Sequence, residues 1–247
     1  MPKGVRDLLV SEIFGPTFQG EGEHVGRLAA FIRLGGCNLT CRWCDTPYTW
    51  AFTNRQAAAH KDGKKYDPQE QMRRVSVGAV AMEVELLMPP STGGCLVISG
   101  GEPMLQQDTV RPMTHELFYE CIEIETAGTV VPTGDWSKRV RWNVSPKLEH
   151  SGNSLKRRYN SEALTWFTLR ANTTFKFVAA TEADLEEVAT LCKLHDIPGR
   201  RIRIMPEGID VETQLRRMRE LADPVLKRGW GMTPRLHTLV WGDERGR

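Results

Sequence analysis

Three cysteines lie within eight residues of this chain, Cys37, Cys41 and Cys44, in a C-x3-C-x2-C pattern. Cysteine thiolates are soft ligands that select zinc or iron–sulfur clusters, and a 4Fe–4S cluster normally takes four of them. A cluster held by three thiolates leaves one iron free to bind another molecule. The spacing therefore indicates a metal centre that carries out chemistry.

Two other kinds of centre remain open at this point. A structural zinc site needs four ligands in a closed tetrahedron, and here the fourth would have to come from His24, His60 or a distant cysteine. An electron-transfer cluster would take its fourth cysteine from elsewhere in the chain. None of these candidate ligands lies at a recognisable spacing from the triad, so we favour the cluster with an open iron.

Length and composition limit the class of protein that can carry this site. The chain has 247 residues, 40% of them hydrophobic, which suits a single domain over residues 1–247. The net charge of +2 gives no electrostatic case for binding nucleic acid or a membrane. The longest apolar runs, such as 95–99, are too short to cross a bilayer. No apolar stretch follows residues 1–6, so we expect no signal peptide and a cytoplasmic location.

The other three cysteines are scattered among apolar neighbours, at Cys95, Cys121 and Cys192. A chain without a secretory signal keeps its thiols reduced. We therefore expect these three to be buried, reduced thiols that pack as small hydrophobic side chains.

Short β-rich segments alternate with helical ones along the chain. Expected strands span 8–14, 29–34, 95–99, 121–125, 141–144, 174–179, 201–205 and 236–241. Expected helices span 75–88, the residues after Thr181, and 211–221, and a further helix closes at 116–120. This alternation predicts an α/β fold, an incomplete and mostly parallel barrel of about six βα units.

Loops complete this expected architecture. In parallel folds, ligands gather at the carboxyl ends of the strands. The turns that begin after Ser99, at Glu125 and at Ser145 all fall there. Residues 35–47 form the expected cluster-binding loop, and the polar stretches 47–74 and 148–159 are expected to be solvated loop insertions.

A second motif, Gly100-Gly101-Glu102-Pro103, stands at the end of a later strand. Its glycines let the backbone approach a ligand closely, and Glu102 offers a carboxylate to a ligand ammonium. A strand followed by the cysteine triad, and then by this motif, resembles the radical S-adenosylmethionine superfamily. The resemblance implies that the open iron binds the nucleotide's amino and carboxylate groups. Reductive cleavage of the C5′–sulfur bond then yields a 5′-deoxyadenosyl radical that abstracts a substrate hydrogen.

Longer matches narrow the resemblance. Segments 18–22, 31–39 and 43–46 are similar to the 7-carboxy-7-deazaguanine synthase family, and further matching segments follow in the expected order from about residue 13 to 246. The family implies conversion of 6-carboxy-5,6,7,8-tetrahydropterin to 7-carboxy-7-deazaguanine with loss of ammonia, as in queuosine biosynthesis. It also implies Mg²⁺, a homodimer and an electron donor such as flavodoxin or ferredoxin.

The resemblance also implies roles for individual residues. Cys37, Cys41 and Cys44 would hold the cluster, and the Thr46 hydroxyl would bind Mg²⁺. Glu21 and Arg33 would act in catalysis. The pterin substrate would lie against Phe18, Gln19, Gly20, Glu21, Arg33, Ser99 and His237. The nucleotide would contact Trp43, Cys44, Asp45, Gly101, Glu102, Ser145, Pro146, Lys147, Met205 and Glu207.

Plainer interpretations accompany several of these roles. Without the motif, Thr46 is a turn residue and Arg33 a surface residue of a strand. Arg235 and His237 fit either pocket closure or a structural role. The chain also departs from the family at Ala127, where we expect asparagine. A glycyl-radical activase and a non-catalytic metal module are the competing functions, and neither needs the pterin-binding set.

Overall fold

The computed structural model describes residues 7–247. Residues 1–6, on which the expected absence of a signal peptide partly rests, lie outside this range. Among the described residues, no helix has the length and apolar character to cross a membrane.

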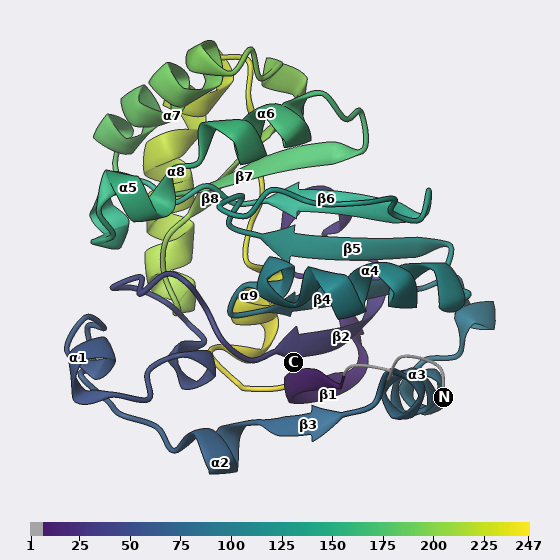
Figure 1. Ribbon diagram of the computed structural model, residues 1–247. Coiled ribbons are helices and arrows are strands. Elements are labelled where there is room, and N and C mark those ends of the chain that lie inside the picture. Colours follow the sequence, from purple (N-terminus) through teal and green to yellow (C-terminus); the bar gives the residue numbers. More distant parts are fainter. Residues whose placement is uncertain (1–6) are drawn as a thin grey trace.

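The described residues form a nine-stranded sheet with the order β3-β1-β2-β4-β5-β6-β7-β8-β9 (Figure 1). The strands are β1 (Leu8–Phe18), β2 (Leu28–Leu34), β3 (Arg73–Val75), β4 (Cys95–Gly100), β5 (Cys121–Thr126), β6 (Val140–Val144), β7 (Thr173–Ala179), β8 (Ile202–Pro206) and β9 (Gly231–Met232). Strands β2 and β4 to β9 pair in parallel, whereas β1 pairs antiparallel with both β2 and β3. The sheet is open, with β3 and β9 at its edges. The predicted fold class, an incomplete and mostly parallel barrel, is confirmed.

Helices connect most of the parallel strands. They are α1 (Asn54–Ala57), α2 (Pro68–Gln71), α3 (Val77–Leu87), α4 (Gln107–Glu116), α5 (Leu155–Arg158), α6 (Ser161–Thr168), α7 (Glu182–Leu194), α8 (Val211–Lys227) and α9 (Leu236–Trp241). The capping residue predicted for α7 is confirmed, because Asp184 accepts a hydrogen bond of 2.9 Å from the Thr181 amide. The connection from β5 to β6 contains no helix.

Alternate residues of each strand face two different environments. In β4, Leu96 and Ile98 are buried in the main hydrophobic core, which also contains side chains of α3 and α4. Cys95 and Val97 lie in a smaller cluster on the other face, toward the barrel interior, and Ser99 follows them on that face. The same alternation in β2, β5 and β7 places polar residues at the carboxyl ends of the strands, on the inside of the barrel.

The predicted strand at 236–241 is wrong, because this segment is helix α9. Its backbone makes helical hydrogen bonds, from Leu239 to Arg235 and from Gly242 to Thr238. The neighbouring edge strand β9 has only two residues, so an extended segment here would have little to pair with. Gly242 ends the helix with a φ of 71°.

The two polar stretches are less solvated than expected. Residues 47–51 are buried, and Trp50 is 2% exposed beside the cysteine triad. Within 148–159, Asn153 accepts a hydrogen bond from the Thr40 amide, and Arg157 donates one to the Asn38 carbonyl. The polar composition of these stretches did not predict the contacts, because the loops bury their polar groups by hydrogen-bonding them to each other.

Glycine allows the end of β4 to lie directly against the cysteine loop. A Cβ atom at Gly101 would come within 2.1 Å of the Gly36 carbonyl oxygen. The Glu102 amide donates to that same carbonyl at 2.8 Å. Gly101 and Glu102 of the Gly-Gly-Glu-Pro motif therefore support the loop that carries the cysteine triad.

Replacing Gly101 by alanine tests this contact. We expect Gly101→Ala to lower the free energy of unfolding by about 1–3 kcal/mol through overpacking, and to reduce iron incorporation on reconstitution. Gly78→Ala is the control, because Gly78 lies in α3 with nothing near its Cβ position and alanine favours a helix. Urea unfolding and iron analysis measure both effects. Equal stability and iron content in the two variants would contradict the packing role of Gly101.

Candidate active site

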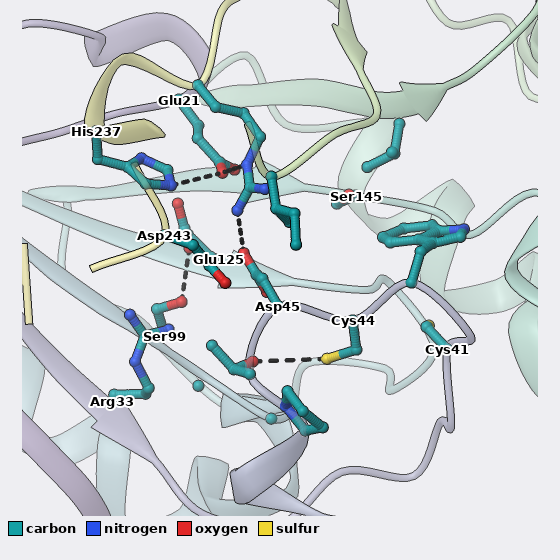
Figure 2. A pocket seen from close by; sticks show the side chains of 18 of the residues that line it. Glu21, Arg33, Cys41, Cys44, Asp45, Ser99, Glu125, Ser145, His237 and Asp243 are labelled. Atoms are coloured by element: carbon teal, nitrogen blue, oxygen red, sulfur yellow. Dashed lines mark hydrogen bonds and ion pairs between the residues drawn. The ribbon is translucent and has the colours of Figure 1, made fainter. Parts of the chain in front are cut away.

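A cavity of about 370 Å³ opens at the carboxyl ends of the parallel strands. Most of the predicted site residues line it, namely Phe18, Gln19, Glu21, Arg33, Cys37, Cys41, Trp43, Cys44, Asp45, Thr46, Ser99, Gly101, Ser145, Lys147, Met205, Glu207 and His237. Figure 2 shows Cys41 and Cys44 at one side and Arg33, Ser99 and His237 at the other, with Asp45 between them.

The three cysteines of the triad receive hydrogen bonds at their sulfur atoms. The Leu39 amide donates to Cys37 at 3.4 Å, Asn153 Nδ2 to Cys41 at 3.3 Å, and Trp50 Nε1 to Cys44 at 3.3 Å. Such donors stabilise negative charge on cluster thiolates. The donor set therefore fits an iron–sulfur cluster.

The spacing of the three sulfurs also argues for a cluster. The three Sγ atoms do not all lie within 4.8 Å of one another, as the ligands of a single ion would. The candidate fourth ligands lie elsewhere. His60 contacts the Cys44 carbonyl at 2.7 Å, and His24 contacts Glu123. The structure thus gives no support to the closed zinc site.

Burial raises the pKa values of all three triad thiols, that of Cys41 to about 12. The thiols therefore hold their protons at neutral pH until a metal displaces them. Cluster assembly should accordingly release protons and be favoured by higher pH.

Four charged side chains form an ion network between the cysteines and the far side of the cavity. Lys176 of β7 pairs with Glu21, Arg235 binds Glu21 at 3.1 Å, and Arg235 also pairs with Asp45. Burial alone would raise the pKa of Glu21, but Lys176 and Arg235 outweigh it and hold that pKa well below its usual value. Glu21 is therefore an ionised carboxylate in the folded protein.

Sequence reasoning predicted Glu21 and Asp45 for this site but missed Lys176 and left Arg235 open. One signal was available, because Lys176 interrupts an otherwise apolar strand between Phe175 and Phe177. A lysine buried in a strand is rare unless it is paired.

A second arginine, which is half-buried, lies across the cavity. Arg33 Nε donates to Glu12 at 2.6 Å, and Glu12 also accepts from Tyr48 at 2.9 Å and Arg245 at 3.0 Å. Among the described residues, no hydrogen bond engages the terminal nitrogens of Arg33. The fork of the guanidinium is thus free to bind a carboxylate. The sequence did not indicate Glu12 or Tyr48 as its supports.

Polar groups form the floor of the cavity next to Arg33. Ser99 lies beside Arg33 in register and donates to Glu125 at 2.6 Å. Gln19 Nε2 donates to Glu123 at 2.5 Å and to Glu125 at 3.2 Å. Burial raises the pKa of Glu125, which favours its protonated form as a donor. These groups offer paired donors and acceptors to a flat polar heterocycle.

Helix α9 contributes the outer wall of the cavity. His237 Nε2 lies 3.9 Å from Glu21, and burial lowers the pKa of His237. A Cβ atom at Gly20 would meet the His237 ring at 2.0 Å, so the glycine lets the two segments touch. Phe18 stacks on Trp241 with ring centroids 6.0 Å apart.

The predicted nucleotide-binding residues lie on the cysteine side. Buried Trp43 Nε1 has no hydrogen-bond partner, and Lys147 Nζ lies 5.7 Å from the Trp43 ring centroid. Lys147 also donates to Ser145 at 2.9 Å. Glu207 pairs with Arg217. The Trp43 Nε1 atom is therefore a buried donor without a partner among the described residues.

Three predicted residues, Gly20, Glu102 and Pro146, do not line the cavity. Glu102 is fully buried and accepts hydrogen bonds from Thr126 at 2.7 Å and the Ala127 amide at 2.8 Å. Its carboxylate thus joins β4 to β5. The contact at Ala127 uses the backbone, which any residue could supply.

Two places could be considered for a divalent cation. Thr46 is buried, and its hydroxyl lies 3.6 Å from Cys44 Sγ. Glu21, Asp45 and His237 also converge, but the Arg235 guanidinium already pairs with both carboxylates. The acidic group is therefore already occupied by a cation of the protein.

Comparisons with known proteins identify the class of the chain. Residues 18–134 match the family described as "4Fe-4S single cluster domain". The cysteine triad and the open parallel barrel agree with this match, which indicates an iron–sulfur enzyme of the radical S-adenosylmethionine type.

Full-length relatives identify the family more closely. The chain is 32% identical to "7-carboxy-7-deazaguanine synthase" of Pyrobaculum aerophilum, over 96% of each chain. It is 30% identical to the protein of the same name from Bacillus subtilis, over the full length of both. The "Crystal structure of QueE from Escherichia coli" superposes with a TM-score of 0.67 at 25% identity, covering 94% of this chain and 95% of that one. The chain belongs to the 7-carboxy-7-deazaguanine synthase family, and so acts in deazapurine biosynthesis.

The ion network gives a prediction about stability. Glu21→Gln leaves Lys176 and Arg235 without their buried partner and should cost about 3–5 kcal/mol of unfolding free energy at pH 7. Because the folded pKa of Glu21 is depressed, this difference should be complete above about pH 4.3 and shrink as the pH falls further. Urea unfolding of cluster-free protein at pH 7, 5 and 4 measures it.

Glu83→Gln is the matched control, since its ion pair with Arg73 is exposed and should contribute less than about 1 kcal/mol. If both variants lost the same small amount of unfolding free energy at pH 7, the ion network around Glu21 would not stabilise the fold as predicted.

The Trp50 contact gives a prediction about the cluster. Trp50→Phe removes the N–H donor to Cys44, so the reduced cluster loses stabilisation and its reduction potential should become more negative. A redox titration followed by electron paramagnetic resonance measures the potential. Trp166→Phe, on α6 and outside the cavity, should leave it unchanged. A potential that did not move in Trp50→Phe would show that this hydrogen bond does not tune the cluster.

Proposed function

We propose that this chain converts 6-carboxy-5,6,7,8-tetrahydropterin to 7-carboxy-7-deazaguanine, with loss of ammonia and with Mg²⁺ as a cofactor. The observation that carries the proposal is the free guanidinium fork of Arg33, which faces the cysteine triad across one cavity. The substrate would therefore lie between the residue that binds its carboxylate and the centre that generates the radical.

The chain's own residues would position the reacting groups. Cys37, Cys41 and Cys44 would hold the cluster, which supplies the electron that cleaves S-adenosylmethionine to the 5′-deoxyadenosyl radical. Trp43, Ser145 and Lys147 would hold the nucleotide with Asp45, Gly101, Met205 and Glu207 around it. Gly20, Glu102 and Pro146 would support these contacts from outside the cavity.

The pterin would occupy the opposite half of the cavity. Gln19 and Glu125 would bind its amide and amino edge, Phe18 and Ser99 would lie beside it, and Arg33 would bind its carboxylate. Ionised Glu21, with His237 beside it, would face the ring that contracts. Held by Lys176 and Arg235, Glu21 would serve as a fixed, ionised hydrogen-bond acceptor for the departing amine. Fixing the ring against the nucleotide's C5′ lowers the barrier by orientation.

Thr46 would bind Mg²⁺ through its hydroxyl, because hard cations prefer oxygen ligands. The metal would orient the substrate and polarise it for ring contraction. We further propose that residues 1–247 act as a single domain, that the protein is a homodimer, and that flavodoxin or ferredoxin supplies the electron. The product would enter queuosine or another deazapurine pathway.

A glycyl-radical activase is less well supported. Its substrate is a protein backbone, which needs neither the free Arg33 fork nor the Gln19 and Glu125 floor.

The direct test is an anaerobic reaction of reconstituted protein with dithionite, S-adenosylmethionine, Mg²⁺ and 6-carboxytetrahydropterin. Mass spectrometry should detect 7-carboxy-7-deazaguanine at more than one equivalent per nucleotide consumed. Formation of 5′-deoxyadenosine without the deazapurine would retain the radical chemistry and overturn the substrate assignment.

Two variants separate the assigned roles. Arg33→Lys keeps the charge but loses the fork, so we expect KM for the pterin to rise about tenfold to a hundredfold, which corresponds to one charge-assisted hydrogen bond. Nucleotide cleavage without pterin should persist. Thr46→Ala should keep the cluster spectrum and lose most of the stimulation by Mg²⁺. An unchanged KM in the first variant, or an unchanged Mg²⁺ response in the second, would remove the corresponding role.

A further inference from the structure

A second group of metal-binding side chains lies at the opposite end of the barrel interior. Cys95 begins β4 and Cys121 begins β5, and the two residues are direct partners in register. Ser99 and Glu125 lie four residues further along the same strands. At about 3.3 Å per residue, the cysteine pair lies roughly 13 Å below the cavity. It is therefore separate from the cluster loop.

His24 completes this group. A ring nitrogen of His24 and the two sulfur atoms of Cys95 and Cys121 all lie within 4.8 Å of one another. The sulfur atoms of Cys37, Cys41 and Cys44 do not all lie this close to one another. Two thiols and one imidazole at this spacing form a donor set typical of zinc, which takes tetrahedral sulfur and nitrogen ligands.

Glu123 contacts His24 in the way that a carboxylate commonly contacts a histidine ligand of zinc. His24 Nδ1 lies 2.5 Å from Glu123 Oε2. Ligating histidines typically give one ring N–H to a carboxylate, which fixes the tautomer and leaves the other nitrogen to the metal. Glu123 is itself held by Gln19 at 2.5 Å and Asn143 at 3.0 Å, so its position is fixed.

The pair lies inside the protein, with one partly open side. Both cysteines are buried. The His24 side chain is 20% exposed, which gives an ion and a water molecule a way in.

We propose that Cys95, Cys121 and His24 bind one Zn²⁺ ion, with water as the fourth ligand and Glu123 orienting the histidine. Binding forms two zinc–sulfur bonds and one zinc–nitrogen bond, and the two thiol protons pass to solvent. The ion ties β4 and β5 to the turn at Gly22–His24. Because Glu123 also holds Gln19, the site fixes the floor of the cavity from below.

The test uses the full-length protein with its iron–sulfur cluster reconstituted, because X-ray absorption at the zinc edge does not detect iron. After incubation with zinc chloride and gel filtration, we expect one zinc per chain. Its spectrum should show two sulfur ligands at about 2.3 Å and lighter ligands at about 2.0–2.1 Å. Zinc below about a tenth of an equivalent, or a shell of three or four sulfurs as in the cysteine triad, would overturn the proposal.

Variants assign the ligands. Cys95→Ser and Cys121→Ser should each reduce bound zinc to background while the iron content stays normal. Cys192→Ser, at a buried cysteine on α7, is the matched control and should retain one zinc. Unchanged zinc in either of the first two variants would exclude these ligands.

His24→Gln and Glu123→Gln guard against misfolding of the cysteine variants. His24 is partly exposed and lies in a short turn, so its replacement should leave the cluster intact. We expect Glu123→Gln to weaken zinc affinity about tenfold to a hundredfold, and His24→Gln by at least as much. Affinity measured against a zinc chelator that matched the parent in both variants would contradict the site.

Discussion

The ion network from Lys176 through Glu21 and Arg235 to Asp45 holds the active site together. Its four members come from β7, the loop after β1, the start of α9 and the residue that follows Cys44. Segments far apart in the sequence are therefore fixed relative to the cysteine loop by ion pairs, of which only the Asp45 end is exposed. Because each charge has a partner, the network avoids the large cost of an isolated buried ion.

The same arrangement gives the cavity its polarity. Glu21 is kept ionised by two cations, whereas Arg33 across the cavity keeps a free fork because Glu12 occupies only its Nε. One side of the cavity thus carries a paired carboxylate, and the other a guanidinium donor group. Ser99 and Glu125 add further hydrogen-bonding groups. The chain orders these functions along the carboxyl ends of its parallel strands, as expected for the fold.

Much of the fold and many of the site residues could be predicted from the sequence. The cysteine triad is local, so its spacing alone indicated the metal centre, and the apolar runs of β4 and β5 marked buried parallel strands. Helix α9 could not be predicted, because a six-residue segment that ends in the apolar run Leu239–Trp241 fits a short strand as well. Only the short edge strand β9, with little backbone to pair with, favours the helix. Partners such as Glu12 for Arg33 depend on long-range contacts, which one sequence does not reveal.

Isotope transfer gives the most direct test of the central claim that the cavity holds the pterin ring against the nucleotide's C5′ atom. Substrate deuterated at C6 is turned over anaerobically, and the recovered S-adenosylmethionine and 5′-deoxyadenosine are analysed by mass spectrometry. The account predicts deuterium at the 5′ carbon, because the hydrogen passes directly between the two bound molecules. Product formation with no deuterium in the nucleotide would show that C6 is not the position facing C5′, and would contradict the account.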